Sequence, residues 1–325
     1  MSTCTPLAPN TLVDAGHALH DRALQVLASE PRLPLPGKGD TLQRWRRLAA
    51  VAASDLCLVK VLEAHHDALA ILSELGCSPE ATHLLHAVWA AEPPDARLDY
   101  GDGFVTGTKA WCSGAPFVDI ALITAHHGDA LQLVRVDMRA AGITHDTRCW
   151  NAIGMGRVTS GRIHFDRVGA EPLGGPGDYL TRPGFWHGGA GIAACWFGAT
   201  TAIAEVLRTH PKALHDPYAV AHLGAIDVGV TAVAAQLREA ASLIDAQPLQ
   251  DHQVEVMRVR ASAEALATDV LQRVGRALGP VPLCEDAAHA RRCSDLEVFI
   301  RQSHAERDWA SLGRAAAQRA ATWTL

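Results

Sequence analysis

The chain has 325 residues, a net charge of −6, 48% hydrophobic residues and 20% charged residues. This composition excludes a disordered protein, and the scattered arginines form no basic stripe of the kind that binds nucleic acid. The length is sufficient for a large core and two or three subdomains.

The cysteines and the N-terminal residues indicate a cytoplasmic protein. Eight cysteines occur without a Cys-x-x-Cys pair, which favours reduced thiols. Residues 1–16 contain two prolines and an aspartate but no apolar core, so we expect no signal peptide. No run of about 18 apolar residues is evident, so we also expect no membrane span.

Apolar residues at helical spacing predict helices in the first part of the chain. One covers residues 13–29, and a second begins at the cap Asp40 or Thr41 and continues to about residue 58 or 63. A third covers residues 66–75 and ends at Gly76, a residue suited to a left-handed helix end. Residues 1–88 are therefore predicted to form an N-terminal helical domain.

After residue 88 the apolar pattern changes to a period of two, which is typical of strands. Turn residues separate the strands that we predict over residues 87–91, 104–113, 120–125, 131–137 and 162–166. A turn at Asp102-Gly103 precedes the second strand, and Gly114-Ala115-Pro116 separates it from the third, so we expect these two strands to form a hairpin. Residues 89–178 are predicted to form a central antiparallel β-domain.

The remainder of the chain is predicted to be a C-terminal helical bundle, residues 179–325. Breaks at prolines and at Gly279-Pro280 separate the predicted helices over 192–207, 218–245, 253–278 and 286–313. Glycines 188, 189 and 191 open the first of them. Helices and strands that are segregated along the chain in this way indicate an α+β fold.

One motif is more specific than this order of elements. It reads Gly107-Thr108-Lys109-Ala110-Trp111-Cys112-Ser113-Gly114-Ala115, followed by Val118-Asp119 and an apolar strand. It resembles the flavin-contacting strand of the acyl-CoA dehydrogenase superfamily. The resemblance covers nearly the whole chain, with a shortened N-terminal helical part, and it implies FAD as cofactor, with FMN as the alternative.

The resemblance also implies roles for residues of this motif. Trp111 would pack by the isoalloxazine ring, with Cys112 next in the chain and the Ser113 hydroxyl near flavin N5. Because side chains of a strand alternate between its faces, we expect Trp111 and Ser113 to share one face. The alternative is that Trp111 is a core aromatic of an ordinary hairpin.

Three further stretches are similar to the family. Residues 89–94, Trp-Ala-Ala-Glu-Pro-Pro, lie where the family has T-E-P-x-x-G-S-D, which implies that Ala91 and Glu92 border the cofactor. Residues 150–168 resemble the segment that closes the β-domain, and residues 54–76 are a weaker match. Arg208 is the nearest counterpart of the family arginine that binds the FAD diphosphate, although the Phe-Gly that follows it in the family is absent.

The catalytic glutamate of the family has no direct counterpart. Acyl-CoA dehydrogenation needs a carboxylate that removes the α-proton while flavin N5 takes the hydride. At the family position this chain has Ser303 or His304, and Glu306 follows within one helical turn. Imidazole titrates near neutrality, so His304 is suited to proton transfer in a flavin monooxygenase of the same superfamily. Alternatively, His304 is a polar residue on a charged helix face.

Three functions follow from the resemblance. The first is oxidation of an acyl thioester or a related small molecule, with an electron-transfer partner. The second is a flavin monooxygenase that uses reduced flavin, oxygen and a flavin reductase. The third is a non-catalytic binding or assembly relative. The family implies a homodimer or homotetramer packed through C-terminal helices, and the histidines show no metal spacing, so we predict no metal site.

Overall fold

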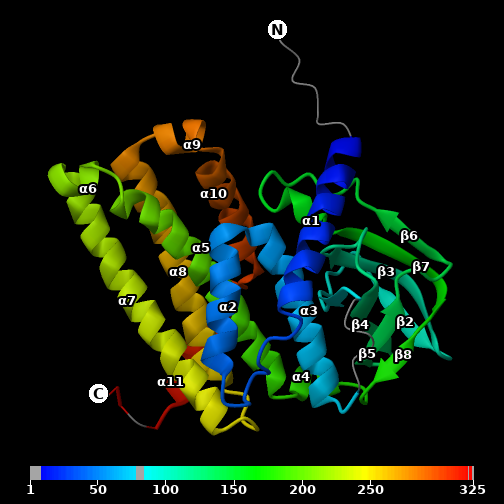
Figure 1. Cartoon of the computed structure of the whole chain (residues 1–325). Helices are drawn as coiled ribbons and strands as arrows, with labels where there is room; N and C mark the ends of the chain where they lie inside the picture. The colour runs from blue at the N-terminus through cyan, green and yellow to red at the C-terminus, as the bar shows by residue number, and fades with distance from the viewer. Residues whose placement is uncertain (1–8, 78–83, 321, 324–325) are drawn as a thin grey trace. The chain divides into compact units, whose positions relative to one another are not determined.

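The computed structural model describes residues 9–77, 84–320 and 322–323. Helices precede a β-sheet, and further helices follow it (Figure 1). The chain forms two compact units whose segments alternate along the sequence. The sheet unit comprises Met1–Leu33 and Cys57–Gly184, and the helical unit comprises Pro34–Leu56 and Phe185–Leu325.

The sheet unit is built on eight strands of described residues in the order β6-β7-β3-β2-β4-β5-β8, with β1 paired to β4. Most pairs are antiparallel, whereas β4 pairs in parallel with β1 and β2. The strands are β1 His86–Trp89, β2 Leu98–Gly101, β3 Phe104–Cys112, β4 Ile120–His127, β5 Ala130–Asp137, β6 Ile143–Asp146, β7 Gly161–Gly169 and β8 Glu171–Leu173.

The predicted hairpin of β3 and β4 is wrong. β3 pairs with β2 and β7, and β2 lies between β3 and β4. The hairpin is formed by β2 and β3, because Asp102 and Gly103 both adopt left-handed φ angles, 52° and 79°, as a two-residue type I′ turn requires. Strand β2 is four residues long and shows no clear alternation, which is why the sequence pattern missed it.

Helices α1 (Pro9–Ser29), α3 (Leu56–Glu74) and α4 (Asp178–Thr181) accompany the sheet, together with the short helix η1 (Gly156–Val158). His65 Nδ1 in α3 accepts a hydrogen bond of 3.1 Å from the His86 amide of β1. Near the end of α3, Arg182 Nη1 donates to Glu74 Oε2 at 2.6 Å. The helix predicted to run to residue 58 or 63 instead ends at Ser54, and α3 is continuous from Leu56.

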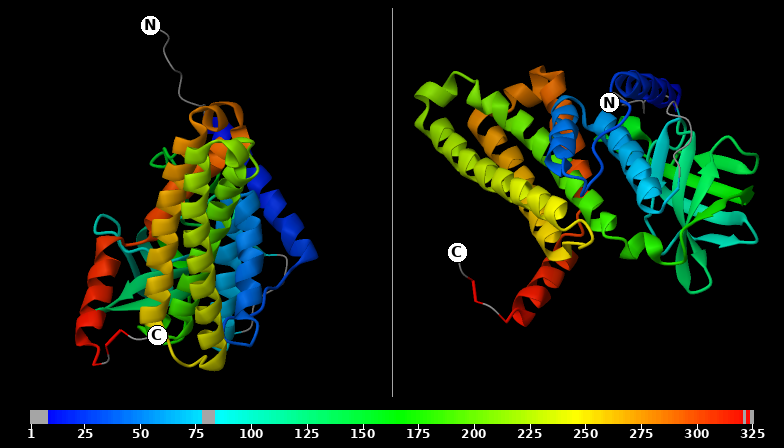
Figure 2. Two further views of the ribbon diagram at one scale, coloured as in Figure 1. Left: turned by 90° about the vertical axis from the view of Figure 1, so that its left-hand side faces the viewer. Right: turned by 60° about the horizontal axis from the view of Figure 1, so that its bottom comes forward.

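The helical unit contains α2 (Thr41–Ser54), α5 (Gly184–Arg208), α6 (Lys212–His215), α7 (Pro217–Ala246), α8 (Gln253–Leu278), α9 (Val281–Glu285), α10 (Ala287–Phe299), η2 (Ile300–Gln302) and α11 (Glu306–Gln318). Helices α7 and α8 lie side by side (Figure 2). α5 approaches α2 so closely that a Cβ on Gly198 would lie 2.1 Å from the Ala49 carbonyl oxygen. α5 begins at Gly184, so its glycines lie inside the helix.

Two helix boundaries differ from expectation for tertiary reasons. Asp40 makes no capping bond; instead Asp245 of α7 accepts from the amides of Gly39 and Thr41, each at 3.0 Å. The single helix predicted over 286–313 is broken between Phe299 and Glu306. Ser303 is extended and Ala305 has φ 43°, a conformation that interrupts helical hydrogen bonding.

Two described helices, α5 and α7, are long and apolar enough to cross a membrane, contrary to the expectation that no segment qualifies. The qualifying window of α5 is 67% buried, which is typical of a core helix, whereas that of α7 is 17% buried. Length and composition alone are weak evidence for a span, because core helices share both.

Candidate functional site

The motif around Trp111 lies at the end of β3, where the strand is irregular. The pairing with β7 shifts register between Lys109 and Cys112, and Trp111 takes a left-handed φ of 59°. The Trp111 side chain is 59% exposed and meets Trp150 edge-on, with ring centroids 6.3 Å apart. Trp111 is therefore not a core aromatic, and its exposed ring can form the wall of a binding site.

Ser113 follows the strand rather than belonging to it. Its amide donates to the Trp111 carbonyl at 3.1 Å, its carbonyl accepts from Trp89 Nε1 at 3.0 Å, and its hydroxyl lies 2.9 Å from Ser160 Oγ. The strand alternation from which we expected Trp111 and Ser113 to share one face therefore does not extend to Ser113, because β3 ends at Cys112 and is bulged just before it. Cys112 is buried between them, and burial raises the pKa of its thiol.

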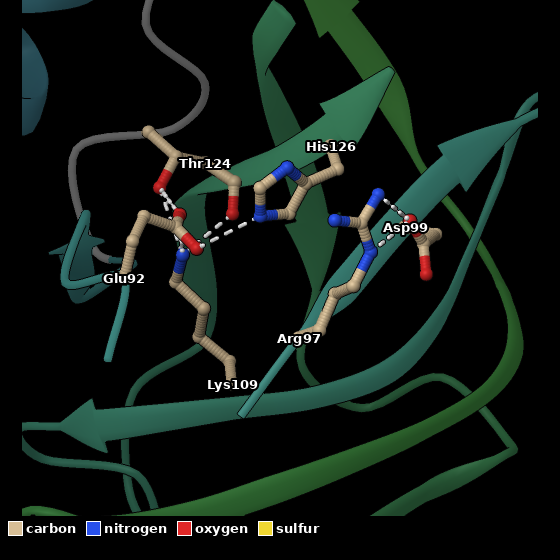
Figure 3. Close-up of polar contacts among 6 residues, drawn as sticks. All are labelled: Glu92, Arg97, Asp99, Lys109, Thr124 and His126. Atoms are coloured by element: carbon tan, nitrogen blue, oxygen red, sulfur yellow. Dashed lines mark hydrogen bonds and ion pairs between the residues drawn. The ribbon is translucent and has the colours of Figure 1, made fainter. Parts of the chain in front are cut away.

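Behind this strand end, Glu92, Lys109, Thr124 and His126 form a cluster that we call the Glu92 cluster (Figure 3). Lys109 is 2% exposed and donates to Glu92, to the Thr124 carbonyl at 2.7 Å and to Thr124 Oγ1 at 2.8 Å. Thr124 Oγ1 donates to Glu92 Oε1 at 2.5 Å, and His126 Nε2 lies 3.5 Å from Glu92 Oε2. The Glu92 carboxylate is thus directed towards the sheet.

The electrostatics of the Glu92 cluster follow from burial. Burial lowers the pKa of Lys109 from its ordinary value, and the hydrogen bond and charge of Glu92 oppose that shift. Lys109 and Thr124 were not among the site residues predicted from the sequence. The available signal was a lysine next to the apolar end of a predicted strand, Ala110-Trp111-Cys112, because a buried lysine requires an acidic or carbonyl partner. Ala91, next to Glu92, is exposed after the end of β1.

The second predicted group lies in the helical unit, in a segment that we call the Ser303–Asp308 turn. This segment comprises the break after η2 and the first residues of α11. Ser303 Oγ accepts from the Ala305 amide at 3.0 Å. Asp308 Oδ2 accepts from the His304 amide at 3.2 Å, and Asp308 Oδ1 lies 3.5 Å from His304 Nδ1. The His304 side chain is 65% exposed, and Glu306 is exposed in the first turn of α11. The structure therefore places Ser303 and His304 in the break before α11 and Glu306 in the first turn of α11, and hydrogen bonding joins His304 to Asp308.

Arg260 of α8 supports this turn from inside the helical unit. It donates to the Gly189 carbonyl of α5 at 2.7 Å and to the Gln302 carbonyl at 3.2 Å. Its guanidinium also lies over the ring of Trp196, 4.9 Å from the centroid, and Trp196 is fully buried. Arg260 thereby connects the residue before Ser303 to the first half of α5.

Arg208 ends α5 at the surface. Its guanidinium pairs with Glu205, and this hydrogen bond raises the pKa of Arg208. The described cysteines are thiols, whereas Cys4 lies outside the described residues. Within residues 9–77, 84–320 and 322–323, no group of three or more His, Cys, Asp or Glu residues is arranged to hold a metal ion.

The residues at the end of β3 suit a flavin ring. An exposed, flat indole at Trp111 can cover one ring face, and the half-buried Ser113 hydroxyl can hydrogen-bond to its polar edge. The Arg208 guanidinium is bound by Glu205 instead of presenting both of its edges to a diphosphate. The donor set therefore fits the isoalloxazine more completely than the adenosine half of FAD.

The fold is that of the acyl-CoA dehydrogenases and of monooxygenases built on the same architecture. The glutaryl-CoA dehydrogenase of Mycobacterium smegmatis, solved with FADH2, superposes with a TM-score of 0.74 at 13% identity, covering 98% of this chain and 97% of that one. TdsC from Paenibacillus sp. A11-2, a dibenzothiophene monooxygenase solved with FMN and indole, has a TM-score of 0.71 at 17% identity, covering 94% and 96%.

Among curated proteins, the dibenzothiophene monooxygenase of Mycolicibacterium goodii is 25% identical over 244 residues. The aligned stretch covers 62% of this chain and 57% of that protein, so the match spans a little over half of the relative's length. No protein-family model matches the chain.

Proposed function

We propose that this protein is a flavin-dependent monooxygenase on the acyl-CoA dehydrogenase fold. The observation that carries the proposal is the Ser303–Asp308 turn, in which an imidazole is paired with a carboxylate. The sequence resemblance assigns the catalytic glutamate of the family to this part of the chain. The similarity to dibenzothiophene monooxygenases supports it. This function replaces acyl-thioester oxidation as the leading hypothesis, and Glu306 is the base that the dehydrogenase hypothesis would require.

Each site residue has a role in this proposal. Reduced flavin, when bound, supplies two electrons to oxygen, so that one oxygen atom enters the substrate and the other leaves as water. Trp111 covers the ring, Ser113 hydrogen-bonds to its edge, and the backbone at Ala91 and Glu92 borders it. Cys112 fills the space behind the strand, because its side chain is buried.

His304 moves the proton that this chemistry requires, since imidazole can donate or accept near neutral pH. The Asp308 carboxylate, 3.5 Å from Nδ1, orients the ring. Ser303 holds the turn through its bond to the Ala305 amide. Hydrogen bonds to Ser303, which precedes His304, and to Asp308, which follows it, thus hold the turn that carries the proton-transfer residue.

FMN is the cofactor we favour, with FAD as the alternative. Arg208 is engaged by Glu205 and lacks the Phe-Gly that follows the diphosphate-binding arginine in the family. TdsC was solved with FMN. The substrate class we propose is a small, flat, apolar heteroaromatic or organosulfur molecule, in keeping with the indole complex of TdsC.

The proposed enzyme works in the cytoplasm with a flavin reductase and assembles as a homodimer or homotetramer. The window of α7 that qualifies by hydropathy is only 17% buried, and Tyr218, Val220 and Val228 are exposed on this helix. An apolar helix face of this kind is buried when copies of a chain associate.

The test is a titration followed by a turnover assay. The purified protein is titrated with FMN, then supplied with a flavin reductase, NADH, oxygen and either indole or dibenzothiophene. We expect flavin binding and a product that has gained one oxygen atom. Flavin that is bleached by butyryl-CoA without oxygen would instead identify a dehydrogenase, and a protein that binds neither FMN nor FAD would be a non-catalytic relative.

A further inference from the structure

The segment between β1 and β2, residues 90–97, is tied to the strands around Trp111 at three places. Before the segment, Trp89 Nε1 donates to the Ser113 carbonyl at 3.0 Å. Within it, Glu92 pairs with Lys109 of β3. Near its end, Asp95 pairs with Arg162 of β7. All of these residues belong to the sheet unit, so the backbone at residues 91–92 is held against the end of β3.

The Lys109 contact is the most buried of the three. Its side chain is 2% exposed, against 33% for Arg162, and its ammonium is surrounded by oxygens of Glu92 and Thr124. A buried ammonium requires such partners because transfer of an unpaired charge from water is very unfavourable. The three oxygen partners therefore allow the Lys109 ammonium to lie in one position between two segments.

The sequence positions of this pair give it a function beyond stability. Lys109 lies two residues before Trp111, and Glu92 directly follows Ala91. The Lys109–Glu92 contact therefore connects the two backbone segments between which the flavin ring is proposed to bind. Side chains that lock neighbouring groups into position contribute to affinity by pre-organising the site.

We propose that Lys109 is a positioning residue for the flavin: through Glu92 and Thr124 it sets the spacing between residues 90–92 and residues 111–113. This inference rests on the proposed flavin-binding function of the same site. In this inference the Glu92 side chain contacts Lys109 rather than the cofactor. The backbone at residues 91–92 then borders the cofactor.

The test uses Lys109→Met, which keeps the unbranched stem of the side chain and removes the terminal ammonium group. Arg135→Met is the matched control, because Arg135 pairs with Glu171 between β5 and β8, away from β3 in the sheet order. For each protein, FMN affinity is measured by fluorescence quenching and thermal stability by circular dichroism. Amide hydrogen exchange is measured over residues 90–97 and 111–115.

We expect Lys109→Met to weaken FMN binding by about tenfold or more, and Arg135→Met to change it less than about twofold. Exchange should accelerate in both segments of Lys109→Met and in neither segment of the control. The double variant Lys109→Met/Glu92→Gln should recover part of the affinity, because it removes the unpaired carboxylate as well.

Two results would distinguish a failure of the positioning role from a failure of the proposed function. If the unaltered protein binds FMN and folded Lys109→Met binds it equally well, the positioning role is overturned and the proposed function stands. If the unaltered protein binds no flavin, the proposed function fails, and unchanged exchange in Lys109→Met would reject the spacing role as well. Should Lys109→Met not fold, Thr124→Val makes the same comparison with a smaller perturbation.

Discussion

The end of β3 and the turn from Ser303 to Asp308 present their predicted site residues in different ways. Both contain a non-glycine residue with positive φ, Trp111 at 59° and Ala305 at 43°. At the end of β3, strand pairing and the buried Glu92 cluster stabilise this conformation. In the turn it is held by two side-chain bonds at the surface.

This contrast separates two tasks. A cofactor wall must keep a fixed shape, and a buried ionic cluster behind paired strands provides that rigidity. A residue that moves protons needs access to reactants and solvent, and an exposed imidazole on a short turn provides that access. Substitutions at the two places should therefore affect different quantities, kcat in the turn and FMN affinity at the end of β3.

His304→Ala should produce the largest change. We expect kcat to fall by roughly 100-fold, because removing a proton-transfer group typically has an effect of this size. FMN affinity should stay within about twofold. Steady-state turnover and FMN titration measure the two quantities. Glu306→Ala is the matched control on the same turn; if it, and not His304→Ala, removes activity, the chemistry is that of a carboxylate base.

Trp111→Ala should weaken FMN binding rather than lower kcat. We expect FMN binding to weaken by about 10- to 100-fold, because the ring loses its aromatic wall. Thermal stability should change little, since the indole is 59% exposed. A variant that binds FMN as tightly as the unaltered protein would show that the cofactor lies elsewhere. Trp323→Ala, at an exposed tryptophan near the C-terminus, is the control.

Acid should weaken the sheet unit through His65. Burial and the neighbouring His86 lower the pKa of His65 to about 3. The unfolded chain binds a proton there near pH 6.5 and the folded chain does not, so stability is present above pH 6.5 and falls as the pH falls towards 3. Between pH 7 and 5.5 this group should lower the free energy of unfolding by about 1 kcal/mol.

Urea unfolding of the protein and of His65→Gln at the two pH values measures this effect. The glutamine variant cannot titrate, so its stability should change less over the same range. Equal pH dependence in both proteins would mean that another group is responsible.

Ala305→Gly should have the smallest effect. Glycine adopts positive φ without a Cβ clash, so relief of strain should stabilise the turn, partly offset by the greater freedom of the unfolded chain. We expect a net gain of about 0.5 kcal/mol in urea unfolding, with kcat lowered a few-fold because His304 is held less firmly. A loss of stability would show that the Ala305 conformation is unstrained.

The regular elements of both units were largely predictable from local pattern. The helix expected over residues 253–278 matches α8 (Gln253–Leu278), and α7 extends one residue beyond the expected range at each end. Long helices with breaks at proline have strong periodic signals. Strands β2, β6 and β8 were missed because their three or four residues carry little apolar alternation, whereas the equally short β1 is almost wholly apolar and was predicted.

The candidate site was predictable only in part. The motif at residues 107–115 pointed to Trp111 and Ser113, and the alignment of the last helices pointed to His304. The bulge that turns Trp111 outwards depends on pairing with Ile163 and Gly161 of β7, far along the chain. No proline or glycine marks the break at Ser303 in the sequence. A single helix was therefore predicted across it.

The local sequence pattern specified the order of helices, strands and helices and the resemblance to a flavoprotein family, and it predicted Ser303 or His304 at the position of that family's glutamate. These properties depend on local periodicity and on residue identity. The tertiary structure decided which strands are neighbours, how Trp111 is exposed, and that Glu92 and Lys109, seventeen residues apart in the printed sequence, form a buried pair. Such contacts follow from sheet register and burial, which bring together residues whose spacing along the chain carries no periodic signal.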